Sequence, residues 1–260
     1  SPIRRSAPSA PGHLTAHGIR AAYGGFTALD GVDLTVSPGR VTGLIGPNGA
    51  GKSTLFHCLS GALRPTSGQV ILSGRDITRR PPHIRARLGL ARTFQQPAVF
   101  PGLTVGENVR VGAEQGAAGQ GSAKGPAAEA RALRLLGLSG LRDTLAAELP
   151  TGVLRRVELA RALAGSPRVL LLDEPAAGLD SAEVAALARV LRALAADGMA
   201  LLIVEHDLDL IGDLADTVHT MAAGRIIGSG PAAPVSPSAP SSPSPSPSPS
   251  APSSAPSSSS

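Results

Sequence analysis

Residues 46–53 read GPNGAGKS, and this stretch decides the fold. It fits the pattern G-x-x-x-x-G-K-[ST]. The apolar residues 41–45 precede it, and a short apolar stretch closed by Gly61 follows it. A strand, a glycine-rich turn and a helix in this order are the context that a phosphate-binding loop requires. We therefore interpret residues 46–53 as a phosphate loop rather than as an ordinary glycine turn.

The chemistry of such a loop suggests a role for each residue type. Glycines let backbone N–H groups turn inward around phosphates, and the N-terminus of the following helix adds positive potential. Lys52, one of only two lysines in the chain, is predicted to reach the β- and γ-phosphates, and the Ser53 hydroxyl to bind Mg²⁺. The predicted nucleotide-binding residues of the loop are Gly46, Pro47, Asn48, Gly49, Ala50, Gly51, Lys52, Ser53 and Thr54.

Two further apolar runs end in polar residues. Residues 169–172 lead to Asp173 and Glu174, and residues 199–204 lead to Glu205 and His206. Continuous apolar strands that alternate with helices indicate a parallel sheet that is covered on both faces. Ligands of such sheets bind beyond the carboxyl ends of the strands. We therefore expect these residues to gather beside the phosphate loop.

The adjacent carboxylates Asp173 and Glu174 need not share a role, because neighbouring side chains of a strand point in opposite directions. Asp173 is predicted to hold the Mg²⁺ shell, and Glu174 to orient and deprotonate an attacking water. Taken alone, such a pair more often marks a solvated turn. Its position downstream of a phosphate loop favours the catalytic interpretation.

The chain divides by composition into a folded unit and two tails. We expect a disordered tail over residues 1–12 and another over residues 231–260, which hold 10 of the 24 prolines and 14 serines. Residues 13–230 are expected to fold as one domain. The sequence begins at Ser1 rather than at Met, so we expect the chain to be processed or to be part of a longer polypeptide.

Residues of about 97–157 are predicted to form a helical subdomain inserted into the α/β core. Thr104 and Glu107 have the spacing of a capping box, which predicts the start of a helix. Residues 127–136 read as a second helix that stops at Gly137. A further helix, outside this region, is expected to begin at about Ser181.

Composition and charge exclude several classes of protein. The longest apolar runs are far shorter than the ~20 residues of a membrane-spanning helix. A single cysteine, Cys58, excludes an internal disulfide, and we interpret it as a small buried hydrophobe. The net charge of +5 comes mainly from scattered arginines, and five aromatic residues provide no stacking platform, so we expect no nucleic-acid partner.

Taken together, these motifs resemble those of ATP-binding cassette (ABC) ATPases, and the resemblance covers residues 13–230. The segments that carry it are the phosphate loop, RTFQQ, LPTGVLRRVELARAL, LLLDEPAAGLD and VEHD. The segment ARLGLARTFQQPAVFPGLTVGENV also resembles the subgroup that energises branched-chain amino-acid importers. The resemblance implies an α/β fold with a P-loop NTPase core, which is RecA-like and mostly parallel, an N-terminal antiparallel β part and an inserted helical subdomain.

The resemblance also implies roles for single side chains. Tyr23 is expected to stack on adenine, and Gln95 to contact Mg²⁺ or its water as a catalytic and metal-binding residue. His206 is expected to reach the γ-phosphate and to help position Glu174. Asp180 is expected to act across a dimer interface, although Asp180-x-x-Glu183 also has the spacing of a helix cap.

One segment departs from the family. The signature L-S-G-G-Q, which acts on the nucleotide of the opposite subunit, is represented here by residues 149–153, LPTGV. Leu149, Thr151 and Gly152 remain as signature residues that act in trans, whereas the usual serine and glutamine are absent. We therefore expect a heterodimer in which the second subunit supplies an intact signature.

The expected cofactors are ATP and Mg²⁺. The expected partners are transmembrane permease subunits, a second ABC ATPase subunit and, indirectly, a solute-binding protein. The subunit would lie peripherally at the cytoplasmic face of the membrane and energise import of branched-chain or other amino acids. Two alternatives stay open at this point: a soluble ABC ATPase that acts on ribosomes or DNA, and a regulatory nucleotide-binding subunit of low turnover.

Overall fold

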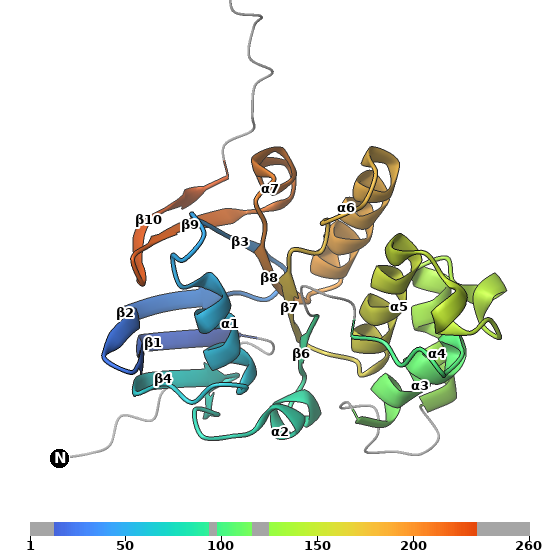
Figure 1. Ribbon diagram of the computed structural model, residues 1–260, viewed down its shortest axis with the longest axis horizontal. Helices are drawn as coiled ribbons and strands as arrows, with labels where there is room; N and C mark the ends of the chain where they lie inside the picture. The colour runs from blue at the N-terminus through green and yellow to red at the C-terminus, as the bar shows by residue number, and fades with distance from the viewer. Residues whose placement is uncertain (1–12, 94–97, 116–124, 233–260) are drawn as a thin grey trace, which may run out of the picture.

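The computed structural model describes residues 13–93, 98–115 and 125–232, which form two sheets and a layer of helices (Figure 1). A four-stranded antiparallel sheet has the order β2-β1-β4-β5, and a six-stranded sheet has the order β10-β9-β3-β8-β7-β6. The smaller sheet consists of β1 (Leu14–Tyr23), β2 (Phe26–Val36), β4 (Ser67–Leu72) and β5 (Arg75–Asp76). The larger sheet consists of β3 (Val41–Ile45), β6 (Leu90–Arg92), β7 (Val169–Asp173), β8 (Ala200–Val204), β9 (Thr217–Ala222) and β10 (Arg225–Pro231).

Helices cover this framework. They are α1 (Lys52–Ser60), α2 (Pro82–Arg87), α3 (Val105–Gln115), α4 (Gly125–Leu135), α5 (Thr151–Ala164), α6 (Ser181–Ala196) and α7 (Leu208–Leu214), with the 3₁₀ turns η2 (Ser139–Leu141) and η3 (Ala146–Glu148). Neighbouring strands β9-β3-β8-β7-β6 run parallel, and β10 pairs antiparallel with β9. The predicted α/β fold, with its antiparallel N-terminal part and inserted helices, is confirmed.

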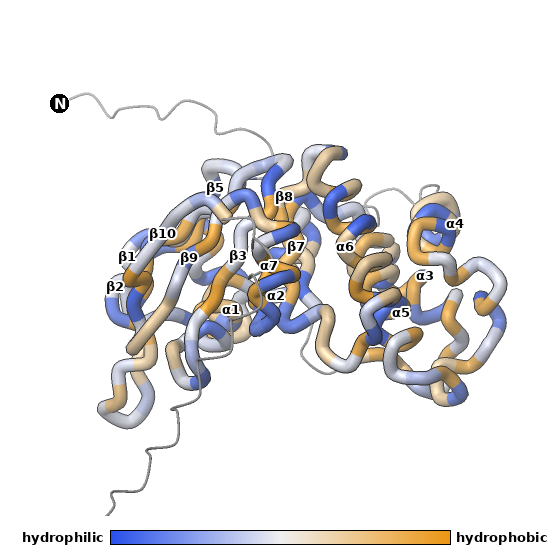
Figure 2. The backbone as a smooth tube through the Cα atoms, turned by 90° about the horizontal axis from the view of Figure 1, so that it is seen from above, coloured by the Kyte–Doolittle hydropathy of each residue, from blue (hydrophilic) through white to orange (hydrophobic). Residues whose placement is uncertain are grey.

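The central strands divide their side chains between two apolar clusters. Val169 and Leu171 of β7 pack with α1 and the antiparallel sheet. Leu170 and Leu172 of the same strand pack with α5, α6 and the other helices on the opposite side. Figure 2 shows these hydrophobic stretches running along the strands between the layers. Burial on both faces explains why the strands read as continuous apolar runs in the sequence.

The predicted capping box begins α3. The Glu107 backbone N–H donates to Thr104 Oγ1 at 3.2 Å, and the Thr104 N–H donates to Glu107 Oε2 at 2.8 Å. Gly106 and Gly112, which lower the intrinsic helix propensity of this segment, lie where α3 is closely packed. A Cβ atom on Gly106 would lie 2.9 Å from Arg142 Cγ, and one on Gly112 would overlap the Arg161 carbonyl oxygen. The two glycines therefore permit close packing of the helical layer.

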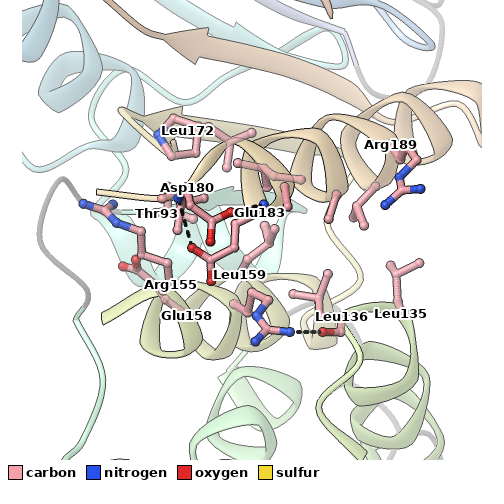
Figure 3. A pocket seen from close by; sticks show the side chains of 18 residues that line it. Thr93, Leu135, Leu136, Arg155, Glu158, Leu159, Leu172, Asp180, Glu183 and Arg189 are labelled. Carbon is pink, nitrogen blue, oxygen red and sulfur yellow. Dashed lines mark hydrogen bonds between the residues drawn. The ribbon is translucent and has the colours of Figure 1, made fainter. Parts of the chain in front are cut away.

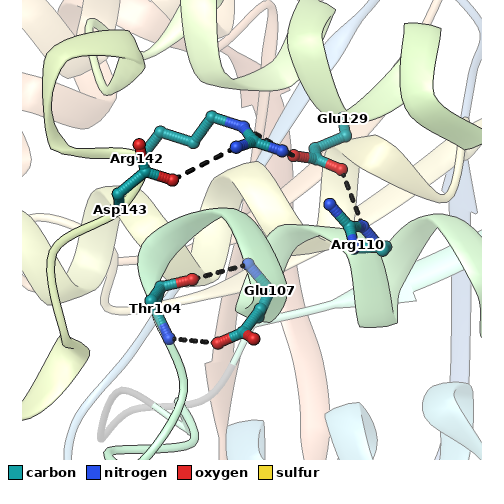
Figure 4. A network of polar contacts seen from close by, with 6 residues as sticks. All are labelled: Thr104, Glu107, Arg110, Glu129, Arg142 and Asp143. Carbon is teal, nitrogen blue, oxygen red and sulfur yellow. Dashed lines mark hydrogen bonds and ion pairs between the residues drawn. The ribbon is translucent and has the colours of Figure 1, made fainter.

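A buried carboxylate joins the helices of this layer (Figure 4). Glu129 of α4 is 3% exposed. Its Oε2 accepts from Arg110 Nε of α3 at 3.1 Å, and its Oε1 accepts from Arg142 Nε at 3.2 Å. Because both guanidinium groups converge on one carboxylate, Glu129 is compensated for its burial and ties α3 and α4 to the segment after η2.

The boundaries of the expected segments differ slightly from the observed elements. Helix α5 crosses the expected end of the helical subdomain at about residue 157. Strand β10 continues through Pro231, so the first residue of the expected C-terminal tail belongs to the sheet. Residues 1–12, residues 233–260 and Gln95 lie outside the described part of the chain. Within that part, no helix is long and apolar enough to span a membrane.

Candidate functional site

The phosphate loop connects β3 to α1 through residues with positive φ. Gly46, Gly49 and Gly51 have φ values of 150°, 79° and 104°. Gly51 is the N-cap of α1, where no side-chain hydrogen bond caps the helix and no acidic residue lies in the first turn. Within the described residues, the N-terminus of α1 therefore has its backbone N–H groups uncapped by a side chain, as an anion-binding helix end requires.

Neighbouring backbone holds two of these glycines closely. The Met221 carbonyl oxygen of β9 occupies the space that a Cβ on Gly46 would need. A Cβ on Gly51 would lie 2.7 Å from the Ala28 carbonyl oxygen of β2. In contrast, among the described residues other than Gly49 and its two chain neighbours, no heavy atom lies within 4 Å of the position of a Cβ on Gly49. Strands from both sheets thus fix the two ends of the loop, while its middle faces open space.

Lys52 begins α1 and folds back over the loop. The residue is 7% exposed. Its Nζ atom donates to the carbonyl oxygens of Gly46 at 2.6 Å and Pro47 at 3.0 Å. Burial lowers the pKa of Lys52, whereas the nearby carboxylates of Glu174 and Asp173 raise it. The ammonium group is therefore held at the centre of the loop, in the field of both predicted acids.

Asp173, the last residue of β7, forms a buried ion pair that the sequence did not predict. Arg92 Nη2 of β6 lies 3.2 Å from Asp173 Oδ2, and the two side chains are 9% and 8% exposed. Burial raises the pKa of Asp173, and the Arg92 guanidinium opposes this shift. The guanidinium also lies over the Phe56 ring of α1, 5.9 Å from its centroid. Arg92 thus links β6, β7 and α1.

Glu174 has a strained backbone and contacts the predicted histidine. Its φ is 48°, in the left-handed region that non-glycine residues rarely adopt, and its N–H donates to the Val204 carbonyl oxygen at 2.9 Å. The Glu174 Oε1 atom lies 2.8 Å from His206 Nε2. Glu174, directly after β7, and His206, two residues after β8, are therefore brought together, as the sequence predicted from the ends of the two strands.

Glu205 also lies at this edge and was not among the predicted site residues. Its side chain is buried, and burial raises its pKa while two backbone N–H groups oppose the shift. Oε1 accepts from the Ala176 N–H at 2.8 Å, and Oε2 accepts from the His206 N–H at 3.2 Å. The only sequence signal was an acidic residue between a buried strand and a predicted histidine.

The predicted adenine-stacking residue lies at the end of a hairpin. Tyr23 ends β1 and pairs with Phe26, the first residue of β2, across the turn formed by Gly24 and Gly25. Both rings are solvent-accessible, with Tyr23 48% and Phe26 68% exposed. The same hairpin supplies Ala28, which contacts the phosphate loop at Gly51. Phe26 is a second exposed aromatic ring at this end of the hairpin and was not among the predicted site residues.

The predicted signature and Asp180 lie together on the other side of β7. Thr151 and Gly152 form the first turn of α5, where Pro150 is the N-cap. Asp180 caps α6 in a box with Glu183, as its spacing predicted: the Glu183 N–H donates to Asp180 Oδ1 at 2.8 Å, and the Asp180 N–H donates to Glu183 Oε2 at 3.2 Å. A Cβ on Gly152 would lie 2.7 Å from Glu183 Oε1.

A cavity of about 490 Å³ separates α5 from α6 (Figure 3). Its lining is largely apolar and includes Leu159 of α5 and Leu187 of α6, with Asp180 and Glu183 also on its wall. Figure 3 shows the Asp180–Glu183 box directed toward α5. The cavity thus adjoins the segment that contains the predicted signature, not the phosphate loop.

The site offers oxygen donors for a metal, not a ready-made cluster. Within residues 13–93, 98–115 and 125–232, no group of three or more His, Cys, Asp or Glu side chains is arranged to hold a metal ion. The predicted ligands Ser53 and Asp173 provide a hydroxyl and a carboxylate, which suit Mg²⁺ when phosphate oxygens and waters complete its shell. The chemistry of the donors therefore fits Mg²⁺ bound together with a nucleotide.

Comparison with known proteins gives consistent matches. The family model described as ABC transporter matches residues 29–177. A ribose import ATP-binding protein of Rubrobacter xylanophilus is 40% identical over 82% of this chain, which spans only 43% of that relative. A lipopolysaccharide export system ATP-binding protein of Acidithiobacillus ferridurans is 37% identical over 84% of this chain and 89% of its own length.

A solved structure agrees with the fold as well. The crystal structure of a nucleotide-free ATP-binding cassette from an ABC transporter matches with a TM-score of 0.77 and 34% identity. The match covers 84% of this chain and 91% of the other. The similarity therefore includes both sheets and the helical layer.

Proposed function

This chain belongs to the ABC transporter family, and we propose that it binds and hydrolyses ATP to energise a membrane permease. The observation that supports this most directly is the meeting of three strand ends. The loop after β3, the acids at the end of β7 and the histidine after β8 lie at one edge of the sheet, with Glu174 and His206 in contact at 2.8 Å. Positioning and charge stabilisation at such an edge are most of what phosphoryl transfer requires.

The phosphate loop is proposed to hold the nucleotide. The glycine-rich backbone of residues 46–51, the start of α1 without a side-chain cap and the buried Lys52 ammonium are proposed to present positive charge to phosphate oxygens. Thr54 would add a hydroxyl one residue beyond Ser53. Tyr23, exposed at the end of the hairpin that contacts the loop, would stack on adenine.

Mg²⁺, when bound, would neutralise charge on the phosphates and help to order them. Ser53 and Asp173 are proposed to hold it, with Gln95, which lies outside the described residues, as a third ligand or as a contact to its water. Arg92 Nη2 pairs with Asp173 Oδ2 at 3.2 Å, and Asp173 Oδ1 is proposed as the metal ligand. The proposed ligands are oxygen donors, as Mg²⁺ prefers.

Glu174 is proposed to accept the proton of the attacking water. A general base must lie within hydrogen-bond reach of that water and must be held in a fixed orientation. His206 satisfies the second condition, since its Nε2 contacts Glu174 Oε1. The partly exposed imidazole would then also reach the γ-phosphate, so the pair would align water and phosphate for an in-line attack.

A second ATPase subunit is proposed to complete the nucleotide site. In that dimer, Leu149, Thr151 and Gly152 would act on the partner's nucleotide, and Asp180 would lie at the interface between the two subunits. The altered signature favours a heterodimer.

We further propose peripheral attachment to transmembrane permease subunits at the cytoplasmic face, with a solute-binding protein acting upstream. The cargo is proposed to be branched-chain or other amino acids. The proposal of an amino-acid cargo rests on the motif resemblance of residues 86–109. The relatives compared above are named for other cargoes, ribose and lipopolysaccharide.

The proposed activity is tested by measuring phosphate release from ATP by the full-length chain, alone and with the subunit that copurifies with it. We expect Mg²⁺-dependent release that Lys52→Ala abolishes. Hydrolysis that persists in Lys52→Ala at the wild-type rate would contradict the proposal. A copurifying permease would in addition identify the transport system, and its absence from a membrane preparation would count against a transport role.

A further inference from the structure

We propose that Glu205 is a positioning residue that holds Glu174 and His206 in a single geometry. Glu205 lies within the segment VEHD but was assigned no role from the sequence. The role in catalysis rests on the proposed function, whereas the structural role can be tested without any hydrolysis. Glu205 would act through its backbone contacts and would touch neither nucleotide nor water.

Glu205 joins two segments that are distant in the sequence. Its Oε1 accepts from the Ala176 N–H at 2.8 Å, two residues after Glu174. Its Oε2 accepts from the His206 N–H at 3.2 Å. One carboxylate therefore fixes the turn that follows β7 and the turn that follows β8.

These bonds close a ring of contacts around the predicted base. The Glu174 N–H donates to the Val204 carbonyl oxygen at 2.9 Å, directly before Glu205 in the chain. The Glu174 side chain meets His206 Nε2 at 2.8 Å. Glu174 is thus held at its backbone by β8, at its side chain by His206, and through Ala176 by Glu205.

The strained backbone of Glu174 shows why such a clamp is needed. Its φ of 48° is unfavourable for a glutamate and persists only where the surroundings fix it. Release of the Ala176 N–H would let residues 174–176 relax toward an ordinary conformation. Relaxation would move the Glu174 carboxylate away from His206, because the strained residue is itself the predicted base.

A carboxylate suits this position better than any neutral group. Both N–H groups are donors, and a carboxylate accepts through both oxygens. Glutamine at position 205 would accept from one N–H and turn its own NH₂ donor toward the other, and aspartate would be one methylene too short to reach both. The side chain is 5% exposed, so water would not readily replace a lost bond.

The first experiment measures hydrogen exchange of single backbone amides in the full-length chain without nucleotide. In Glu205→Gln we expect the backbone amides of Ala176 and His206 to exchange about tenfold faster or more. One amide loses its acceptor directly, and the other exchanges faster because the two turns are no longer held together. Glu129→Gln is the matched control, since it alters an equally buried glutamate whose partners lie in the helical layer. Unchanged exchange at both amides in Glu205→Gln, or equal acceleration in Glu129→Gln, would overturn the positioning role.

The second experiment asks whether Glu205 acts through His206. We expect Glu205→Gln to lower kcat by about tenfold with KM and ATP-analogue affinity unchanged, and to lower it less than about twofold in a His206→Gln background. An equal factor in both backgrounds, or a rise in KM without a fall in kcat, would refute the coupling. If Lys52→Ala leaves hydrolysis intact, the proposed function fails, and amide exchange alone then decides whether Glu205 clamps the two turns.

Discussion

The Met221 carbonyl oxygen occupies the space in which a side chain on Gly46 would begin. Met221 belongs to β9 and Gly46 follows β3, and these two strands are hydrogen-bonded neighbours in the sheet. The phosphate loop therefore starts at a point where the next strand leaves room for a hydrogen atom only. Glycine at position 46 is therefore required by the packing against β9, in addition to its proposed role in a phosphate-binding loop.

This contact predicts a large stability difference between two glycine substitutions in one loop. Gly46→Ala should lower the free energy of unfolding by more than about 2 kcal/mol, because strand β9 must move. Gly49→Ala, with open space around it and a positive φ of 79°, should cost only about 1–2 kcal/mol of backbone strain. Urea denaturation of both variants measures the difference, and an equal loss in the two would contradict the packing argument.

Lys52→Ala should weaken binding of a fluorescent ATP analogue by at least about tenfold, since it removes the cation that is proposed to contact the β- and γ-phosphates. Arg40→Ala provides the control: it removes a cation at the opposite end of β3, where Arg40 pairs with Asp216. Titration of wild type and both variants gives the affinities. Similar affinity in all three proteins would show that residues 46–53 do not hold the nucleotide.

Glu174→Gln should keep nucleotide affinity while lowering turnover by roughly 10²- to 10⁴-fold, the usual contribution of a general base. Glutamine has nearly the same shape as glutamate and would have the same backbone strain at the positive φ of position 174, so the melting temperature should change little. Single-turnover hydrolysis of bound ATP separates the chemical step from binding. Wild-type rates in this variant would exclude Glu174 as the base.

Cys58 should be inert toward thiol reagents in the folded chain. It is fully buried on α1, and burial raises the pKa of its thiol to about 11. At pH 8 the reactive thiolate is therefore about 100-fold scarcer than for an ordinary cysteine, in addition to being inaccessible. A colorimetric thiol assay should detect the cysteine only after denaturant is added, and rapid labelling of the native protein would contradict this prediction.

The altered signature predicts asymmetric turnover in a heterodimer. Pro150 and Val153 stand where the signature has serine and glutamine, so the surface that is proposed to close over the partner's nucleotide lacks the usual hydroxyl and amide. Glu174→Gln in this chain should therefore abolish most of the activity, whereas the matching change in the partner should have a small effect. Phosphate release from dimers with the change in one subunit at a time is the measurement. Equal losses, or a homodimer as active as the heterodimer, would show that this signature is not impaired.

The parts of the molecule that were predictable depend on local spacing. The capping box of Thr104 and Glu107 and that of Asp180 and Glu183 both formed as expected, because each needs only residues three apart. The meeting of Glu174 with His206 was predictable from apolar runs that end in polar residues, since parallel strands deliver their carboxyl ends to one edge.

The contacts that escaped prediction join residues that are distant in the sequence. Arg92 and Asp173 are 81 residues apart, and Glu205 and Ala176 are 29 apart. Each pair depends on strand order, which places β6 beside β7 and β7 beside β8. Sequence patterns identify the strands but not their neighbours, so an arginine in RTFQQ and a glutamate in VEHD gave no sign of their partners.

The alternating side chains of β7 separate two cores of the molecule. Leu171 packs with α1 and the antiparallel sheet, whereas Leu170 packs with the helices on the other side of the sheet. A change of side-chain volume at either position is therefore expected to disturb the packing of its own side first. The core beside α1 and the core beneath the helical layer can in this way be repacked one at a time.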